Sequence, residues 1–290
     1  MQGGVLGPDE LSLVLGKVHS IDALASHATV ARDWSVAVDE HLTAANALRF
    51  CPSRTITADL KLNREVASVA CTSGGEVCVS ESARHRIVIF SPHGEFARVV
   101  GAFGYGPGQL NCPRGLACDE EALYVADRSN HRIQKLCLHT GASLALAGSR
   151  GPPGPGFLKY PQGVALGSAS TARLLFVADY GNDRIVALDS ETLEWAFEFG
   201  SATSLELPGG IAVDDDLVAV TDGARHCVRL YSSFTRSLLR VVGQKGRLPG
   251  EFTQPVGVAL RGGQLIVSEG QGQRLQVFRR DGWRHGVCNV

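Results

Sequence analysis

Residues 125–136 read Val125-Ala-Asp-Arg-Ser-Asn-His-Arg-Ile-Gln-Lys-Leu136, and four other stretches of the chain repeat this pattern. The other copies begin at Val79, Val177, Val220 and Val267, so successive copies are 46, 52, 43 and 47 residues apart. Self-similarity at such a period is the signature of a repeat architecture, in which each unit packs on its neighbours. The repeat therefore decides the fold class.

A second motif precedes four of the five copies and begins with a proline. It reads Pro113-Arg-Gly-Leu-Ala, Pro161-Gln-Gly-Val-Ala, Pro208-Gly-Gly-Ile-Ala and Pro255-Val-Gly-Val-Ala. The first copy has Val66 and Ser68 where the proline and glycine would stand, so its opening strand is the least clearly marked. Within each copy, short β-branched runs alternate with turn residues, which predicts strands.

The second copy shows the whole unit. Strands are expected over 115–118, 123–126, 132–136 and 143–147, separated by turns at 119–121, 129–130 and 140–141. The small residues of the first strand suit a place where backbones approach closely, near an axis. Four antiparallel strands in each repeat are the unit of a β-propeller blade. We therefore expect a mainly β protein with five recognisable blades.

The two motifs closely resemble the NHL repeat, whose pattern is Pro-x-Gly-Val-Ala, then Val-Ala-Asp, then Asn-His-Arg-Ile. The resemblance covers residues 66–290 and implies a propeller of NHL-type blades. Propellers of this family usually have six blades. Residues 46–65, which include Thr55-Ile-Thr-Ala-Asp-Leu60, are expected to be a linker that supplies at most a closing strand. Five-bladed and six-bladed rings both remain open.

An acidic residue and an arginine five positions later recur in the repeat. The pairs are Glu81 with Arg86, Asp127 with Arg132, Asp179 with Arg184 and Glu269 with Arg274. An acid at the end of one strand and an arginine at the start of the next can brace the turn by a bidentate pair. The fourth copy has Cys227 at the arginine position, so Arg225 or Arg229 is expected to pair with Asp222.

Residues 1–45 have a different period and predict a small all-α segment. Leu11, Val14, Leu15 and Val18 fall at i, i+3, i+4 and i+7 of a helix. A second helix is expected over 20–31 and a third over 32–45. So short a segment cannot bury a robust core alone and should pack on the propeller or on a partner.

The spacing of the N-terminal apolar residues resembles the F-box, although Gly7 and His19 depart from its pattern. The matching residues are Pro8, Leu11, Leu15, Leu24, Val30 and Trp34. An F-box followed by a propeller resembles the substrate receptors of cullin-type ubiquitin ligases. The resemblance implies that these residues bind a Skp-type adaptor and that the propeller holds a target protein for ubiquitination and proteasomal degradation. The alternative is a helical extension packed on the propeller.

The loops between second and third strands are expected to share one face with the inter-blade loops. The first set offers Arg84, Arg128, Tyr180, Arg225 and Gln271, and the second offers Arg150, Lys159, Tyr160, Lys245 and Arg247. Arginines and tyrosines around one rim suit the binding of an acidic or phosphorylated segment of a partner. The alternative is that they are ordinary solvated turn residues.

Composition and motifs argue against other functions. The 28 basic and 29 acidic residues give a net charge of −1, so an RNA-binding propeller, the second alternative, would need a local patch. A third alternative, a metal-dependent lyase or lactonase, needs inward-facing ligands, whereas the inner strands read Val-Ala-Cys, Leu-Ala-Cys, Val-Ala-Leu, Ile-Ala-Val and Val-Ala-Leu. We expect no catalysis, no cofactor and no metal. His85, His131 and His226 recur at one repeat position and are expected to be structural.

The sequence also bears on cellular location. The chain contains no apolar run of about 18 residues and no basic, then apolar, leader, so neither a membrane span nor a secretory signal is expected. None of the eight cysteines forms a C-x-x-C pair, which favours free and mostly buried thiols. We expect a cytoplasmic or nuclear protein. The glycine-rich stretch 101–108 is expected to be an inter-blade connection.

Overall fold

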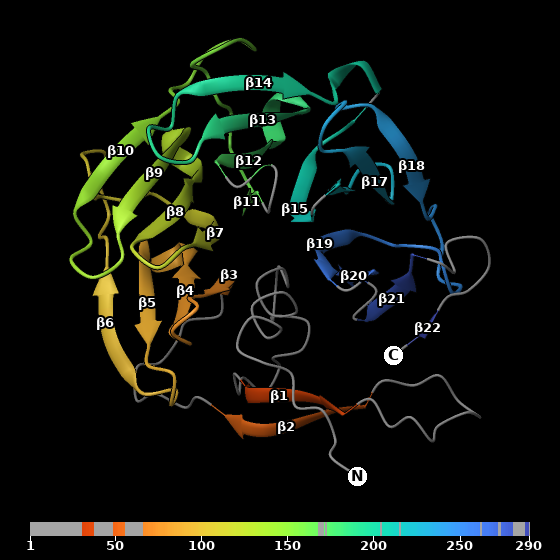
Figure 1. Cartoon of the computed structure of the whole chain (residues 1–290), viewed down its shortest axis with the longest axis horizontal. Helices are drawn as coiled ribbons and strands as arrows, with labels where there is room; N and C mark the ends of the chain where they lie inside the picture. The colour runs from red at the N-terminus through yellow and green to blue at the C-terminus, as the bar shows by residue number, and fades with distance from the viewer. Residues whose placement is uncertain are drawn as a thin grey trace.

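The computed structural model describes residues 31–37, 49–55, 66–167, 171, 173–203, 205–214, 216–261, 263–271, 274–280 and 288–289. These residues form five four-stranded antiparallel sheets and one two-stranded sheet. The five larger sheets are blades arranged around a common axis, with the first strand of each blade nearest the axis and the fourth at the periphery (Figure 1). The described part of the chain is therefore a five-bladed, mainly β propeller, as the repeat predicts.

Each blade is a meander of four consecutive strands. Blades 1 and 2 consist of β3 (Val66–Cys71), β4 (Val77–Glu81), β5 (Arg86–Phe90), β6 (Phe96–Val100) and β7 (Pro113–Cys118), β8 (Ala122–Asp127), β9 (Arg132–Cys137), β10 (Ser143–Ala147). Blades 3 and 4 consist of β11 (Val164–Leu166), β12 (Leu174–Asp179), β13 (Arg184–Asp189), β14 (Trp195–Phe199) and β15 (Pro208–Asp214), β16 (Leu217–Asp222), β17 (Cys227–Ser232), β18 (Leu238–Val242). Blade 5 consists of β19 (Pro255–Arg261), β20 (Gln264–Glu269), β21 (Leu275–Arg279) and β22 (Cys288–Asn289).

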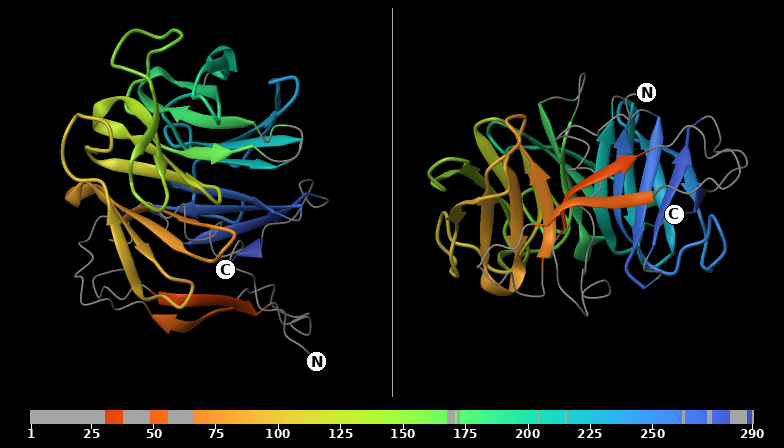
Figure 2. Two further views of the ribbon diagram at one scale, coloured as in Figure 1. Left: turned by 60° about the vertical axis from the view of Figure 1, so that its left-hand side comes forward. Right: turned by 90° about the horizontal axis from the view of Figure 1, so that it is seen from below.

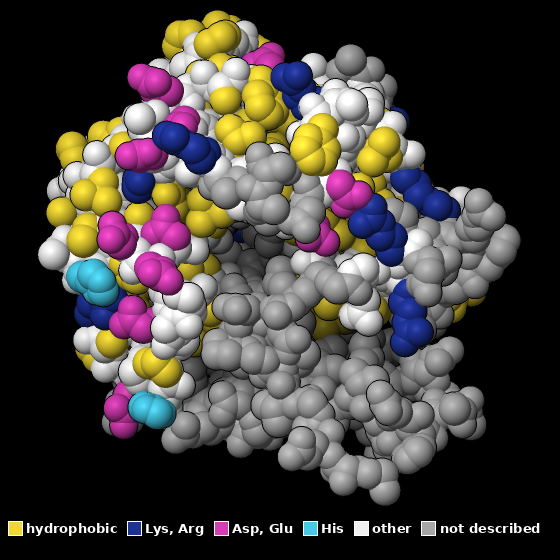
Figure 3. Space-filling view, viewed as in Figure 1, with side chains coloured by type: hydrophobic (Ala, Val, Ile, Leu, Met, Phe, Trp, Pro, Cys, Tyr) yellow, Lys and Arg dark blue, Asp and Glu magenta, His cyan; other side chains and the backbone are white. Residues whose placement is uncertain are grey.

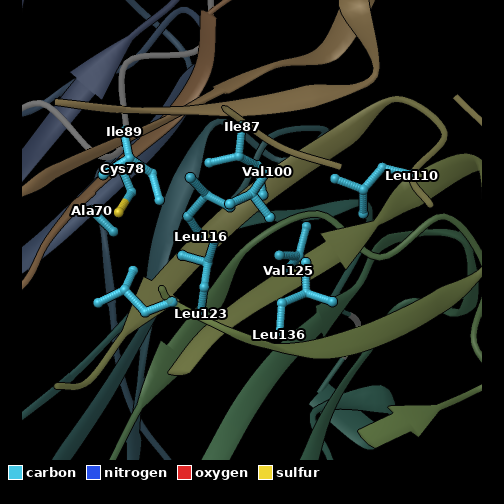
Figure 4. Close-up of a cluster of buried hydrophobic side chains, with 11 residues drawn as sticks. Ala70, Cys78, Ile87, Ile89, Val100, Leu110, Leu116, Leu123, Val125 and Leu136 are labelled. Carbon is cyan, nitrogen blue, oxygen red and sulfur yellow. The ribbon is translucent and has the colours of Figure 1, made fainter. Parts of the chain in front are cut away.

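The core of the protein lies between successive blades. Between blades 1 and 2, Cys78, Ile87 and Ile89 face Leu116 and Leu123, and all of them are at least 95% buried (Figure 4). Equivalent clusters lie between blades 2 and 3, 3 and 4, and 4 and 5. Each fully buried aliphatic side chain contributes about 1.5–3 kcal/mol of transfer free energy, so every blade depends on its neighbours for stability.

Glycines of the Pro-x-Gly motif let the inner strands approach near the axis. The Gly115 amide donates to the Gln162 carbonyl at 2.9 Å, and the Gly163 amide donates to the Gly209 carbonyl at 3.1 Å. A Cβ atom on Gly115 would lie 2.3 Å from that carbonyl oxygen, which is well inside van der Waals contact. The expectation of small residues at a crowded axis is confirmed.

The N-terminal part of the described chain differs from the prediction. Residues of the expected third helix, 32–45, include β1 (Ala31–Ala37), which pairs antiparallel with β2 (Arg49–Thr55). Trp34 and Val36 are two apart, so the sequence also fits the strand period, and pairing with β2 decides between the two periods. This hairpin lies between blades 1 and 5 (Figures 1 and 2). The first expected helix and residues 20–30 of the second lie outside the described residues, and Ala31 begins β1.

Strand β2 also places the expected closing strand differently. It ends at Thr55, where the predicted strand over 55–60 begins, and its partner is β1 rather than a blade strand. Residues 56–65 lie outside the described residues.

The six cysteines of residues 66–280 are free thiols, as expected. Of these six, only Cys78 and Cys227 are buried, so the expectation of mostly buried thiols is wrong for them. The others sit at strand ends or in a loop, where the blade edge meets solvent. No helix in the described part of the chain is both long and apolar enough to cross a membrane.

Candidate functional site

We define the upper face as the end of the propeller that carries the turns between second and third strands and the loops between blades. The turns are 82–85, 128–131, 180–183 and 223–226, and the loops are 101–112, 148–161, 200–207 and 243–254. Backbone hydrogen bonds join the two sets, for example from Ser129 to the Asn111 carbonyl at 3.1 Å and from Gly181 to the Lys159 carbonyl at 2.8 Å. The two sets of loops therefore share one face, as the sequence predicts.

In blades 2 to 5, a buried acid at the end of the second strand fixes the loop that leads into its own blade. The Asp127 carboxylate accepts hydrogen bonds from the backbone N–H of Asn111 at 2.7 Å and from the Asn130 amide at 2.8 Å. Asp179 accepts from Lys159 and Asn182 in the same way. A buried carboxylate needs such donors because an unpaired charge is costly away from water.

The repeat arginine binds the same acid and also the inter-blade loop. Arg132 donates through Nε to Asp127 at 2.8 Å, and its terminal nitrogens donate to the carbonyls of Tyr105, Gly106 and Gln109. Arg184 and Arg274 repeat this pattern in blades 3 and 5. The expected bidentate pair is therefore wrong, because the guanidinium divides its donors between one carboxylate oxygen and the loop backbone.

The fourth blade confirms the expected substitution. Arg229, not the residue at the usual position, donates to Asp222 at 2.7 Å and to the Thr203 carbonyl at 2.8 Å. Arg225 instead forms a surface pair with Glu206 at 3.5 Å. We call the buried acid, its arginine and their hydrogen bonds to the inter-blade loop the acid–arginine clamp. In blade 4 the arginine of the clamp stands two residues further along the strand, because Cys227 occupies the usual position.

The position of the recurring histidine links blade 1 to blade 2, blade 2 to blade 3 and blade 3 to blade 4. The Nδ1 atoms of His85 and His131 accept the backbone N–H of Cys112 at 3.0 Å and of Tyr160 at 3.2 Å, and Asp183 accepts that of Leu207 at 2.8 Å. His85, His131 and Asp183 have left-handed backbone conformations with φ of 52–57°, which Asn, Asp and His tolerate better than most residues. His226 of blade 4 shares the left-handed conformation with a φ of 56°, but its Nδ1 is buried without a hydrogen-bond partner in the described part of the chain. The position therefore keeps a residue that tolerates positive φ in four blades and acts as an acceptor in three.

The structure places all ten residues of the expected partner-binding set on the upper face. Arg84, Arg128, Tyr180, Arg225 and Gln271 lie in or beside the strand-connecting turns, and Arg150, Lys159, Tyr160, Lys245 and Arg247 lie in the inter-blade loops. Only one subset converges: the Arg128 guanidinium lies 5.1 Å from the Tyr160 ring, which in turn packs on His131 with ring centroids 4.4 Å apart. Arg150 and Lys159 act electrostatically on the same histidine.

Sequence reasoning missed the exposed apolar residues of this face. Phe103 and Tyr105 are 56% and 70% exposed and contact each other edge to face at 5.9 Å, and Leu248 is 66% exposed. Phe103 also packs on His85. The sequence did contain a signal for them: Phe103 and Tyr105 lie in the glycine-rich stretch 101–108, which has no strand that would place their side chains in a core.

The remaining expected sites are described only in part. Pro8, Leu11, Leu15, Leu24 and Val30 of the expected adaptor-binding set lie outside the described residues, and Trp34 lies in β1. Among the residues that the structure describes, no group of three or more His, Cys, Asp or Glu side chains is placed to hold a metal ion. On the face seen in Figure 3, Asp and Glu side chains gather over blades 1 and 2.

Comparison with known proteins identifies the repeat. Residues 110–136 match the NHL repeat. The chain carries an NHL repeat. It is 37% identical over 59 residues to RING finger protein nhl-1 of Caenorhabditis elegans, a match that covers 20% of this chain and 6% of that protein. It is 28% identical over 83 residues to NHL repeat-containing protein 2 of Gallus gallus, covering 26% and 11% of the two chains.

Solved structures share the fold. A catalytically inactive virginiamycin B lyase from Staphylococcus aureus with quinupristin superposes with a TM-score of 0.57 and 18% identity, over 79% of this chain and 70% of that one. A streptogramin B lyase structure gives a TM-score of 0.57 and 17% identity, over 77% and 68%. At this level of identity, the likeness is one of fold alone.

Proposed function

We propose that this chain is a protein-interaction module that performs no chemistry itself and binds a target protein on its upper face. One observation carries the proposal: Phe103, Tyr105 and Leu248 are more than half exposed, although the loops that hold them are tied down by the acid–arginine clamps. Exposed apolar and aromatic side chains on loops that are held in place are typical of protein-binding surfaces. The NHL repeat supports the same conclusion.

The test compares two equally apolar surfaces of the full chain. One variant replaces Phe103, Tyr105 and Leu248 with serine, and the control replaces Leu144 and Leu146 on the outer strand β10, which are 55% and 43% exposed. We expect proteins that co-purify with the wild type to be lost from the upper-face variant and retained by the control, as measured by quantitative mass spectrometry. Equal retention by both variants would contradict the proposal.

The finer form of this proposal is a substrate receptor of a cullin-type ubiquitin ligase. It rests on the F-box-like spacing of Pro8, Leu11, Leu15, Leu24 and Val30, and it loses one residue because Trp34 lies in a strand rather than a helix. We expect the full chain to co-purify with a Skp-type adaptor, and Leu11→Asp with Leu15→Asp to abolish this. Unchanged co-purification in the double variant would exclude the receptor role and leave the interaction module intact.

A further inference from the structure

At the junction of blades 2 and 3, cationic side chains gather around two packed rings, those of His131 and Tyr160. His131 is 7% exposed and fixed at two points, because its Nδ1 accepts the Tyr160 amide and its ring packs on the Tyr160 ring. Asp179 holds the loop of Tyr160 by accepting the Lys159 amide at 2.7 Å, and Asp127 holds the turn of His131 by accepting the Asn130 amide at 2.8 Å. The two rings therefore form a rigid floor at this junction.

Three cationic side chains surround this floor. Arg128 lies over the Tyr160 ring, and its Nε is buried without a hydrogen-bond partner within the described part of the chain. Arg150 and Lys159 are exposed and flank the buried Leu158, which pairs with Arg150 in an isolated β-bridge. Burial, and then the charges of Arg150, Arg128 and Lys159, lower the pKa of His131, and Asp179 opposes them.

Within the described part of the chain, Arg128, Arg150 and Lys159 form no ion pair with a carboxylate. The Asp179 carboxylate is fully buried and bonded to Arg184. Two other places on the upper face differ, because Arg84 lies 3.9 Å from Glu81 and Arg225 lies 3.5 Å from Glu206. Lys245 and Arg247 in the loop between blades 4 and 5 also form no ion pair within the described part of the chain, so the junction of blades 2 and 3 is set apart by the way its cations surround the His131 and Tyr160 rings.

An apolar surface adjoins the cationic junction. The Asn130 amide, two residues from Arg128, donates to the Gly104 carbonyl at 2.9 Å. This bond ties the turn of Arg128 to the loop that exposes Phe103 and Tyr105. A bound peptide chain that places an anion between the three cations would therefore find an aromatic pair within reach of its neighbouring residues.

We propose that this junction binds a phosphorylated side chain of the target protein, with an apolar residue of the same segment packed on Phe103 and Tyr105. The inference rests on the proposed function and names the chemistry of its partner. A phosphate monoester carries nearly two negative charges and three acceptor oxygens, which matches three separate donors better than the single charge of a carboxylate. A nucleic acid strand carries one charge per nucleotide and is bound by an extended basic groove, whereas Arg84 and Arg225 on this face are paired with Glu81 and Glu206.

The experiment uses the full chain and three peptide probes. They are fluorescent nonapeptide mixtures with a fixed central phosphoserine, serine or glutamate, all other positions being degenerate, and a single-stranded oligouridine is the fourth probe. The site variant carries Arg128→Gln, Arg150→Gln and Lys159→Gln. The matched control, Arg225→Gln, Lys245→Gln and Arg247→Gln, removes the same charge from other places on the same face. Binding is followed by fluorescence polarisation at near-physiological salt, and folding by thermal unfolding.

We expect the phosphoserine mixture to bind at least about 10-fold more tightly than the serine mixture, since hydrogen bonds between charged groups each contribute about a factor of 10 or more. The site variant should lose this difference, and the control should retain it within about 2-fold. Equal binding of the phosphoserine and serine mixtures, equal losses in the two variants, or tighter binding of the oligouridine would overturn the inference. The upper-face capture experiment is independent, so target binding that persists without phosphate selectivity would leave the proposed function standing.

Discussion

Replacing Arg184 with alanine tests whether the acid–arginine clamp holds the upper face together. Its side chain is 2% exposed and donates to Asp179 at 2.9 Å, to Glu198, and to the carbonyls of Gly154 and Phe157. Removal of one partner of a buried ion pair costs about 3–5 kcal/mol, because the other charge stays buried without compensation. The two loop bonds are lost in the same variant, so we expect R184A to lower the free energy of unfolding by about 4 kcal/mol.

Two other arginines calibrate this value. Arg86 bonds Glu81 at 2.5 Å, but one terminal nitrogen is buried without a partner in the described part of the chain, so it lacks a loop bond of the kind that Arg184 makes. We expect R86A to cost about 2 kcal/mol, the loss of one charged hydrogen bond. Arg173 is 77% exposed and pairs with Glu191 at the surface, so R173A should cost less than about 0.5 kcal/mol.

The assay is urea unfolding followed by circular dichroism, with the free energies taken from the midpoints and a common slope. In a domain of this size each 1 kcal/mol shifts the melting temperature by about 2–4 °C, so R184A should melt about 8–16 °C below the wild type. A loss of less than about 1 kcal/mol for R184A, or equal losses for R184A and R86A, would refute the clamp as the element that holds the loops.

Three further predictions follow from the same geometry. Gly163→Ala should destabilise the protein by more than about 2 kcal/mol, since its Cβ would lie 2.6 Å from a backbone oxygen of the next blade, while Gly74→Ala, with its nearest atom at 3.8 Å, should be neutral in the same urea assay. Burial and neighbouring cations lower the pKa of His131 below 6.5, so as pH falls the unfolded chain takes up a proton at this histidine before the folded chain does. The free energy of unfolding therefore falls as pH drops below about 6.5. His131→Asn keeps an acceptor but does not titrate, so it should flatten the dependence of the urea midpoint on pH between about pH 7 and 5. Burial raises the pKa of Glu269, but its hydrogen bonds outweigh burial, and the net pKa is below 4.5. The stabilisation by this carboxylate is therefore lost as pH falls through the acid range. Glu269→Gln should reduce that acid-dependent loss, as measured by melting curves.

The blades were predictable because their signals are local. Strands such as β8 and β9 follow from alternating apolar residues between turn residues, and the expected ranges 123–126 and 132–136 lie inside the observed ones. Even β3, where the proline and glycine are missing, forms at Val66–Cys71, because its neighbours supply the pairing. Topology alone then placed ten separate rim residues on one face.

The details of the site were not predictable, because they depend on contacts between loops far apart in sequence. The sequence pairs Asp127 with Arg132, but it does not show that the arginine also reaches the carbonyls of loop 101–112. Nor does it show which of the rim arginines meet, since this depends on how loop 148–161 folds against His131. The helix expected at β1 was wrong for another reason. A short segment with Trp34 and Val36 fits both the helical and the strand period, and only pairing with β2 selects the strand.

The acid–arginine clamps hold the loops in a similar way at successive junctions. Specificity for a partner must therefore come from the few side chains that take no part in the clamps. Hydrogen bonds to the loops occupy the donors and acceptors of the clamp acids and arginines. The same holds for the linking side chains of His131 and Asp183. What differs between junctions is the remainder: aromatic residues around Phe103, unpaired cations around Arg128, and a self-neutralised pair at Arg225. A partner that distinguishes one junction from another must therefore do so through these residues. Substitutions there should change binding with little effect on stability, whereas substitutions in the clamps should do the reverse.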